Sequence, residues 1–231
     1  MTDGIFDDLI SFQGMMLDII QLDPDDILFG IPEEYFNDFE HFSQLFKTLI
    51  VIIRTRPLVL VNVFNFISKI KEHISKYYTK TQLLFHFSFN MSAIYHLYKL
   101  NLITLDDALR SNSITKMKSY VYFDPEIEQF KPKLYQENQS SVYFQSLKNS
   151  YSQMDIKKYR ETGLNSSNYA KIIQADDVDS LQKLISQANL DINTLIPRSE
   201  FETNAIFDPK MSISFIEYAA FLGSINVFKF L

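Results

Sequence analysis

Apolar residues recur every three or four positions along the first third of this chain, which is the period of an α-helix. Residues 57–74 show the pattern clearly, with Leu58, Val61, Phe64, Ile67, Ile70 and Ile74 on one face. Residues 5–20 and 33–53 follow the same spacing. A helix of this kind needs a neighbour to cover its apolar face, so we expect these segments to share a core.

The composition agrees with an all-α fold. The 231 residues include 21 Phe and 13 Tyr but only 5 Gly and 7 Pro, so a large core is available and turn residues are scarce. All-β folds need frequent turn residues between short strands. A chain of this length fits two units of ordinary domain size.

Shorter helices are predicted after residue 79. The spacing places them at 81–89, 92–100 and 104–110, each opened by a Ser or Thr that can cap the free amides of the first turn. Residues 111–151 mix prolines, charges and aromatic residues, which predicts one or two short helices in this connection. We place the boundary there, with a helical N-terminal region at 1–150 and a second unit at 151–231.

The charges are distributed unevenly over the first 80 residues. Residues 1–46 carry eleven Asp or Glu and no Lys or Arg, whereas residues 47–80 carry seven basic residues and one acid, Glu72. We expect these opposite charges to have a structural role, in which they either face each other within one bundle or lie on solvated faces. The alternative is that the basic helices 47–80 bind a phosphate-rich or nucleic-acid ligand.

One apolar stretch, residues 49–67, resembles a membrane span in composition but contains Arg54, Arg56 and Pro57. Two central arginines would cost about 5–7 kcal/mol in a membrane, so we interpret the stretch as two buried helices that meet at Pro57. The N-terminus MTDGIFDDLISF carries acids where an export signal is basic, and the chain has no Cys. We expect a cytoplasmic protein without a membrane span.

The C-terminal segment 214–231, SFIEYAAFLGSINVFKFL, has the order helix, glycine turn, helix. An ankyrin repeat has this order, with the pattern T-P-L-H-x-A-A followed by a glycine and an apolar pair. Ala219 and Ala220 are small enough for close helix packing, and Gly223 suits the turn. The residues expected to face a stack of such units are Ile216, Val227, Phe228 and Leu231. The alternative is an amphipathic helical hairpin within one globular domain.

A weaker copy of the segment lies upstream. SNYAKIIQA precedes DDVDSLQKLI in the same order of helix, turn and helix, and Asp176 stands where Gly223 stands in the second copy. After it, Leu190-Asp191-Ile192-Asn193 is similar to the A-D-V-N loop of ankyrin repeats. The turns are 47 residues apart instead of about 33, which predicts an insertion at 194–212 in the form of a long finger-like loop.

Together these segments resemble a known family. RETGLNSSNYAKIIQADDVDSLQKLI, SEFETNAIF and FIEYAAFLGSINVFKFL look like the ankyrin repeat proteins expanded in trichomonad-type protists, which carry an ankyrin-like domain of unknown function. The earlier LYKLNLITLDDAL and YVYFDPEIEQF are similar to the helical N-terminal region of that family. The resemblance implies a helical region followed by a solenoid that binds other proteins, without catalytic residues.

Two residues depart from the repeat pattern. Phe215 replaces the usual proline and Glu217 the usual histidine, so we expect less regular hairpin loops. Leu231 falls inside the second repeat helix, and an array that ended on VFKFL would expose an apolar edge. We therefore expect about two repeats, the second incomplete, within a longer array truncated at its C-terminus.

The residue patterns of enzymes and of metal or cofactor sites are missing from the sequence. The scattered glycines give no nucleotide-binding loop, and no cysteine nucleophile or Gly-x-Ser-x-Gly elbow occurs. His86 and His96 lack the spacing of a helical zinc site, which favours structural or surface roles. Asp23, Asp25 and Glu34 fit positions 1, 3 and 12 of a calcium loop, but its glycine is missing. We predict no catalytic, cofactor-binding or metal-binding residues.

These features favour a protein–protein interaction scaffold or adaptor over an enzyme. Recognition is expected through the concave helical face and the projecting loops of the repeats, and the partner is another protein. Glu217, Tyr218 and Phe221 are exposed candidates for this surface, although Tyr218 and Phe221 fit the core equally well. Nucleic acid is the less favoured partner, and the oligomeric state stays open.

Overall fold

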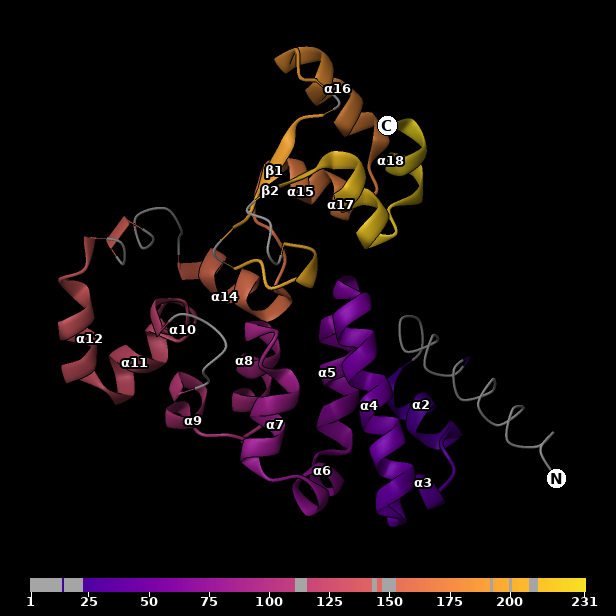
Figure 1. Ribbon diagram of the computed structural model, residues 1–231, viewed down its shortest axis with the longest axis vertical. Coiled ribbons are helices and arrows are strands. Elements are labelled where there is room, and N and C mark those ends of the chain that lie inside the picture. Colours follow the sequence, from indigo (N-terminus) through magenta and orange to yellow (C-terminus); the bar gives the residue numbers. More distant parts are fainter. Residues whose placement is uncertain are drawn as a thin grey trace.

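The computed structural model describes residue 14 and residues 23–110, 116–142, 145–146, 153–191, 193–199, 201–207 and 212–231. Almost all regular elements in these residues are helices, which confirms the all-α prediction (Figure 1). The predicted helix at 5–20 lies outside the described residues, apart from the helical Gly14. Two clusters of buried apolar side chains organise the molecule, one mainly N-terminal and one C-terminal.

The N-terminal helices pack around a core rich in aromatic side chains. They are α2 (Pro24–Gly30), α3 (Glu34–Asn37), α4 (Phe39–Thr55), a short 3-10 turn η1 (Pro57–Val59), α5 (Leu60–Lys69) and α6 (Lys71–Tyr77). The predicted single helix at 33–53 is divided at Asp38, whose carboxylate accepts hydrogen bonds from the amides of Glu40 and His41 and so caps α4. Helix α2 begins at Pro24, and the side chain of Asp23 caps it by accepting a hydrogen bond from the amide of Asp25.

The predicted break at Pro57 is confirmed. The chain bends by 116° between Phe39–Thr55 and Pro57–Lys69, and among the described residues no single helix meets the length and hydropathy needed to cross a membrane. These two helices meet those criteria only when taken together as a bent pair. One predicted core residue is misplaced: Leu58 is exposed, while Leu60 and Val63 fill the core beside Phe64.

The predicted short helices are present with shifted starts. They are α7 (Lys80–Phe87), α8 (Met91–Lys99) and α9 (Leu105–Arg110). Thr79 caps α7 through a reciprocal pair of bonds with Gln82, and Asn90 caps α8 through the amide of Ala93. Ser92, predicted to be a cap, is instead buried inside α8.

The connection contains α10 (Lys116–Tyr122), α11 (Asp124–Phe130) and α12 (Pro132–Gln139), more than the one or two helices predicted for residues 111–151. Helix α14 (Gln153–Thr162) then packs on α8 and α5, and Ile156 and Tyr159 belong to the N-terminal core. The part of the chain that follows residue 150 therefore begins inside the first core, and the second core begins with Ala170.

Two helical hairpins form the second core (Figure 1). We name them the first hairpin, α15 (Asn168–Gln174) with α16 (Val178–Ala188), and the second hairpin, α17 (Phe215–Leu222) with α18 (Ile225–Phe230). Helix α15 packs on α17 and α16 packs on α18, so the hairpins lie side by side. Strands β1 (Leu195–Pro197) and β2 (Ser212–Ser214) pair antiparallel, with Ile196 opposite Ile213.

The described part of the predicted finger-like loop folds back into the molecule. Phe201 is fully buried in the N-terminal core, and Phe207, in the short turn η2 (Ala205–Phe207), is fully buried in the C-terminal core. Two bulky aromatic side chains gain more from burial than from exposure on a projecting loop, which is the physical reason for the difference.

Candidate interaction surface

The two hairpins share one turn geometry. Asp176 and Gly223, 47 positions apart, both have left-handed backbones, with φ of 52° and 74°. The amide of each donates to the carbonyl three residues before it, and the next amide donates to the carbonyl five residues before itself. This bonding pattern ends a helix with one left-handed residue, and it confirms the predicted equivalence of the two turns.

The start of each hairpin is also equivalent. Ser167 caps α15 by accepting a bond from the amide of Ala170, and Ser214 caps α17 by accepting one from Glu217. Ser167 and Ser214 are again 47 positions apart. The helix–turn–helix unit therefore occurs twice, although the two copies differ in sequence.

The two hairpins bury side chains at different repeat positions, because each turns a different side toward the other. In the first hairpin Ala170, Ile173 and Leu181 are buried in the shared core. The residues 47 positions later, Glu217, Ala220 and Phe228, are exposed. The second hairpin instead buries Phe215, Tyr218, Ala219, Leu222 and Val227. The second hairpin therefore turns one side toward the first hairpin, and its other side is uncovered within the described residues.

We name the uncovered side of the second hairpin the outer face, formed by Ile216, Ala220, Ile225 and Phe228. Ile216 is 42% exposed, Ile225 59% and Phe228 46%. The prediction that Ile216 and Phe228 face the stack is wrong for the single neighbour present, because their helices turn the opposite side toward the first hairpin. Val227 is buried and Leu231 is partly buried against the same core, as predicted.

The three residues singled out from the sequence for recognition lie in different environments. Glu217 is exposed, and its carboxylate accepts bonds from the amide and hydroxyl of Ser214, which completes the cap of α17. Tyr218 is fully buried, and Phe221 packs partly buried against the C-terminal core. Tyr218 and Phe221 are therefore core residues, and Glu217 is the one that solvent reaches freely.

Asp176 joins the hairpins through an unusual cap. Its carboxylate accepts bonds from the amide of Val227 at 2.8 Å and from the amide of Asn226 at 3.1 Å. The acceptor at the start of α18 therefore comes from the first hairpin. Ser224, which occupies the cap position of α18, donates to the carbonyl of Ile173 at 2.6 Å instead. These bonds fix the position of one hairpin along the other.

A polar segment, Phe201–Asn204, lies between the two cores, and we name it the wedge. The Tyr122 hydroxyl donates to the carbonyl of Phe201 at 2.8 Å, and the Thr203 hydroxyl donates to Asn90 Oδ1 at 3.1 Å. The amide of Thr203 donates to the carbonyl of Gly163 at 3.2 Å. The wedge is bonded in this way to α8, to α10 and to the end of α14.

The wedge approaches Gly163 too closely for a side chain there. Gly163 has φ of 64°, and a Cβ atom at this position would lie 2.6 Å from both Ser92 Oγ and Thr203 Oγ1. Ser92 itself donates to the carbonyl of Arg160 at 2.7 Å, so its hydroxyl has little room to move. Glycine is needed here for both its backbone conformation and its size.

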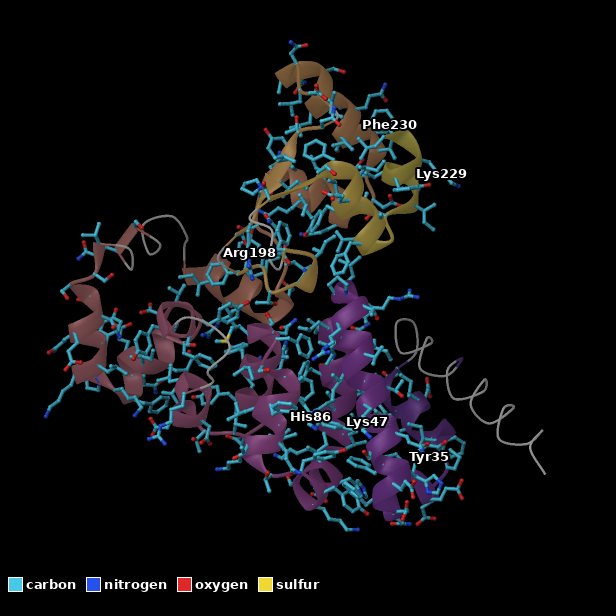
Figure 2. The ribbon with its side chains drawn as sticks, viewed as in Figure 1. Tyr35, Lys47, His86, Arg198, Lys229 and Phe230 are labelled. Carbon is cyan, nitrogen blue, oxygen red and sulfur yellow. The ribbon has the colours of Figure 1, made fainter. Side chains whose placement is uncertain are left out.

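Glu202 carries a buried carboxyl group within the wedge. The side chain is 1% exposed, and it accepts bonds from the Tyr218 hydroxyl at 3.2 Å and from the side-chain amide of Asn204. Burial raises the pKa of Glu202 to about 7, against the lowering effect of these bonds and of Arg198, which lies at the same junction (Figure 2). The carboxyl group therefore titrates near neutral pH.

The basic residues of segment 47–80 are arranged in two ways. Lys69 Nζ lies 2.8 Å from Asp25 Oδ1 of α2, and Lys80 Nζ lies 3.8 Å from Asp107 Oδ2 of α9. These two pairs fit the expectation that opposite charges face each other across helices. Lys47 and Arg54 are exposed on α4 and have no carboxylate partner among the described residues.

His86 and His96 occupy partly or largely buried positions. His96 stacks on Phe64 with ring centroids 4.6 Å apart, and its Nε2 lies 2.8 Å from the carbonyl of Glu161. His86 packs edge-on to Phe46. Within the part of the chain that the structure describes, no three Asp, Glu or His side chains converge on a point where a metal ion could bind.

Comparison of the chain with protein-family models, with curated proteins and with solved structures gives no match. The assignment of a function therefore rests on the residues and contacts described above.

Proposed function

We propose that this chain is a protein–protein interaction scaffold that acts through ankyrin-type repeats and performs no catalysis. The outer face of the second hairpin is the observation that carries the proposal. It presents Ile216, Ile225 and Phe228 to solvent at 42%, 59% and 46% exposure. Exposed apolar patches often mark surfaces that bind another protein, and these three side chains lie on one hairpin.

The interface between the two hairpins supports the choice of partner. The first hairpin already binds a neighbour through Ala170, Ile173 and Leu181. The equivalent positions of the second hairpin are Glu217, Ala220 and Phe228, and Ala220 and Phe228 belong to the outer face. A partner that offers a helical hairpin has the right geometry to pack there. The expectation that further repeats of the same kind provide this hairpin stays a prediction.

Site-specific photo-cross-linking tests the proposal. A photo-reactive benzoylphenylalanine in place of Ile225 should cross-link a distinct protein in a saturable way, and excess unlabelled chain should compete for it. The matched control carries the same group in place of Phe130 of α11, because Ile225 and Phe130 are 59% and 60% exposed. Phe228→Ser should abolish the cross-link from position 225.

Equal cross-linking from positions 225 and 130 would refute the proposal, as would a cross-link that Phe228→Ser leaves unchanged. Either result would mean that the outer face is an ordinary apolar surface without a specific partner.

A further inference from the structure

A row of cationic side chains follows one side of α4. Lys47, Val51 and Arg54 are spaced by four and three residues, which places them on the same side of the helix, and all three are exposed. Lys47 and Arg54 are therefore separated by two helical turns, or roughly 10 Å along the axis.

Helix α7 and the loop after it lie along this row. The His86 ring lies 6.0 Å from the ring of Phe46, a core residue of α4, and the guanidinium of Arg54 lies 4.2 Å above the ring of Phe89. The charge of Lys47 acts on His86, and the two residues lie close together in the view of Figure 2. Side chains that are 39 residues apart in sequence are thus brought to one surface.

Among the described residues, the charged groups that act on His86 are all positive. The pKa of His86 is lowered first by burial and then by the positive charges of Lys47 and Arg54. No carboxylate among the described residues acts on His86, in contrast to Lys69 and Lys80, which face Asp25 and Asp107. Among the described residues, an anion placed here would meet three donors and no carboxylate that acts on His86.

We propose that Lys47, Arg54 and His86 form a binding site for a phosphate group. Lys47 supplies an ammonium, Arg54 supplies a guanidinium that lies over the Phe89 ring, and His86 supplies a ring N–H and, when it is protonated, a third positive charge. This site is smaller than the whole basic segment 47–80, and it includes His86 from outside that segment. The phosphate site and the outer face use different residues, so a test of one proposal does not decide the other.

Phe85 suggests how a phosphate-bearing ligand gains further contact. Its ring is 75% exposed and lies next to His86, with centroids 5.8 Å apart. An aromatic base attached to the phosphate can stack on such a ring. The phosphate can belong to a small molecule or to a single-stranded nucleic acid, and the test below separates these sources.

The experiment follows the His86 ring by NMR in the complete chain at low ionic strength, with inorganic pyrophosphate as the probe and His86→Gln to assign the signal. Pyrophosphate should raise the pKa of His86 by about 0.5–1 unit, because a bound anion favours the imidazolium form. In the double variant Lys47→Gln/Arg54→Gln, the pKa should already be higher without probe, and pyrophosphate should no longer shift it.

The matched control is Lys76→Gln/Lys80→Gln, which removes the same charge from the same segment and should keep the response. The proposal is overturned if millimolar pyrophosphate leaves the pKa of His86 unchanged in the wild-type chain, or if Lys47→Gln/Arg54→Gln responds equally.

An octamer of deoxythymidine distinguishes the sources of phosphate. Binding at least tenfold tighter than that of pyrophosphate, weakened by Phe85→Ala, assigns the site to a nucleic-acid strand. Binding no tighter than pyrophosphate and insensitive to Phe85→Ala assigns it to a small phosphate compound. Both results require the wild-type His86 response and therefore support the phosphate site.

Discussion

At the scale of single residues, two groups at the wedge have strongly altered environments, Glu202 within it and Gly163 beside it. Glu202 is a carboxyl group kept away from water, and Gly163 is a left-handed residue pressed against two hydroxyls. Both lie where the N-terminal and C-terminal cores meet. Their substitution therefore reports on the junction itself.

Glu202 makes stability depend on pH. Its pKa rises from 4.5 in the unfolded chain to about 7 in the folded protein, so the folded state binds the proton more tightly. The free energy of unfolding should fall as pH rises from 4.5 to 7, by about 3 kcal/mol in total for this group, and should level off above pH 7. Glu202→Gln should remove this slope in urea denaturation measured between pH 4.5 and 8.

The control for this titration is Glu128→Gln, at an exposed position of α11, which should keep the wild-type slope. An unchanged slope in Glu202→Gln would show that another group is responsible for the pH dependence.

Gly163 and Gly223 separate steric crowding from backbone strain. Both have positive φ, but a Cβ atom at Gly223 meets no atom within 4 Å, whereas at Gly163 it meets two hydroxyls at 2.6 Å. Gly223→Ala should cost about 1–2 kcal/mol from backbone strain alone. Gly163→Ala should cost about 1–3 kcal/mol more, because it also forces the wedge away from α8. Equal losses in chemical denaturation would contradict this account of the junction.

At the scale of elements, the hairpins show which features a sequence reveals. The turns at Asp176 and Gly223 depend on neighbouring residues, and they lie where the sequence predicts them. The caps at Ser167 and Ser214 also depend on neighbouring residues, and the structure adds them to that prediction. Whether Ile216 and Phe228 are buried or exposed depends on which side of the hairpin a neighbour covers. Helical spacing identifies an apolar side chain but not the partner that buries it.

The cap that Asp176 provides for α18 can be measured at this scale. Asp176→Ala removes the acceptor of the Val227 and Asn226 amides and should cost about 1–2 kcal/mol, the usual range for a lost cap. Asp176→Asn keeps an acceptor oxygen and tolerates positive φ, so it should cost less. Asp179→Ala, at an exposed position in the first turn of α16, serves as the control. Hydrogen exchange at the amides of residues 226 and 227 should quicken at both in Asp176→Ala, at one in Asp176→Asn, which keeps a single acceptor oxygen, and at neither in Asp179→Ala.

At the scale of the whole molecule, the wedge makes the two cores depend on each other. Phe201 comes from the C-terminal part of the chain but fills the N-terminal core beside Tyr122 and Tyr159, with ring centroids 5.6 and 6.1 Å away. The sequence does not predict this contact, because SEFETNAIF is rich in polar residues and its partners lie about 40 and 80 positions earlier. Tertiary packing alone decides the position of such a segment.

The coupling of the two cores predicts how the protein unfolds. The wild-type chain should lose both cores in one transition. Phe201→Ala should destabilise the N-terminal core by about 3–5 kcal/mol and separate the transitions of the two cores. Phe207→Ala removes the same side chain from within the C-terminal core, and it should not weaken the wedge contacts to the N-terminal core. Hydrogen exchange with mass spectrometry, followed over urea concentration, distinguishes the two results.

The burial of Phe201 also has a consequence for synthesis on the ribosome. Helix α14 ends at Thr162, and the first hairpin and β1 must be translated before residue 201 emerges. Throughout that interval the rings of Tyr122 and Tyr159 lack the side chain that covers them in the finished protein. The nascent chain therefore passes through a stage with an incomplete N-terminal core, which is the stage where a chaperone would find exposed aromatic surface.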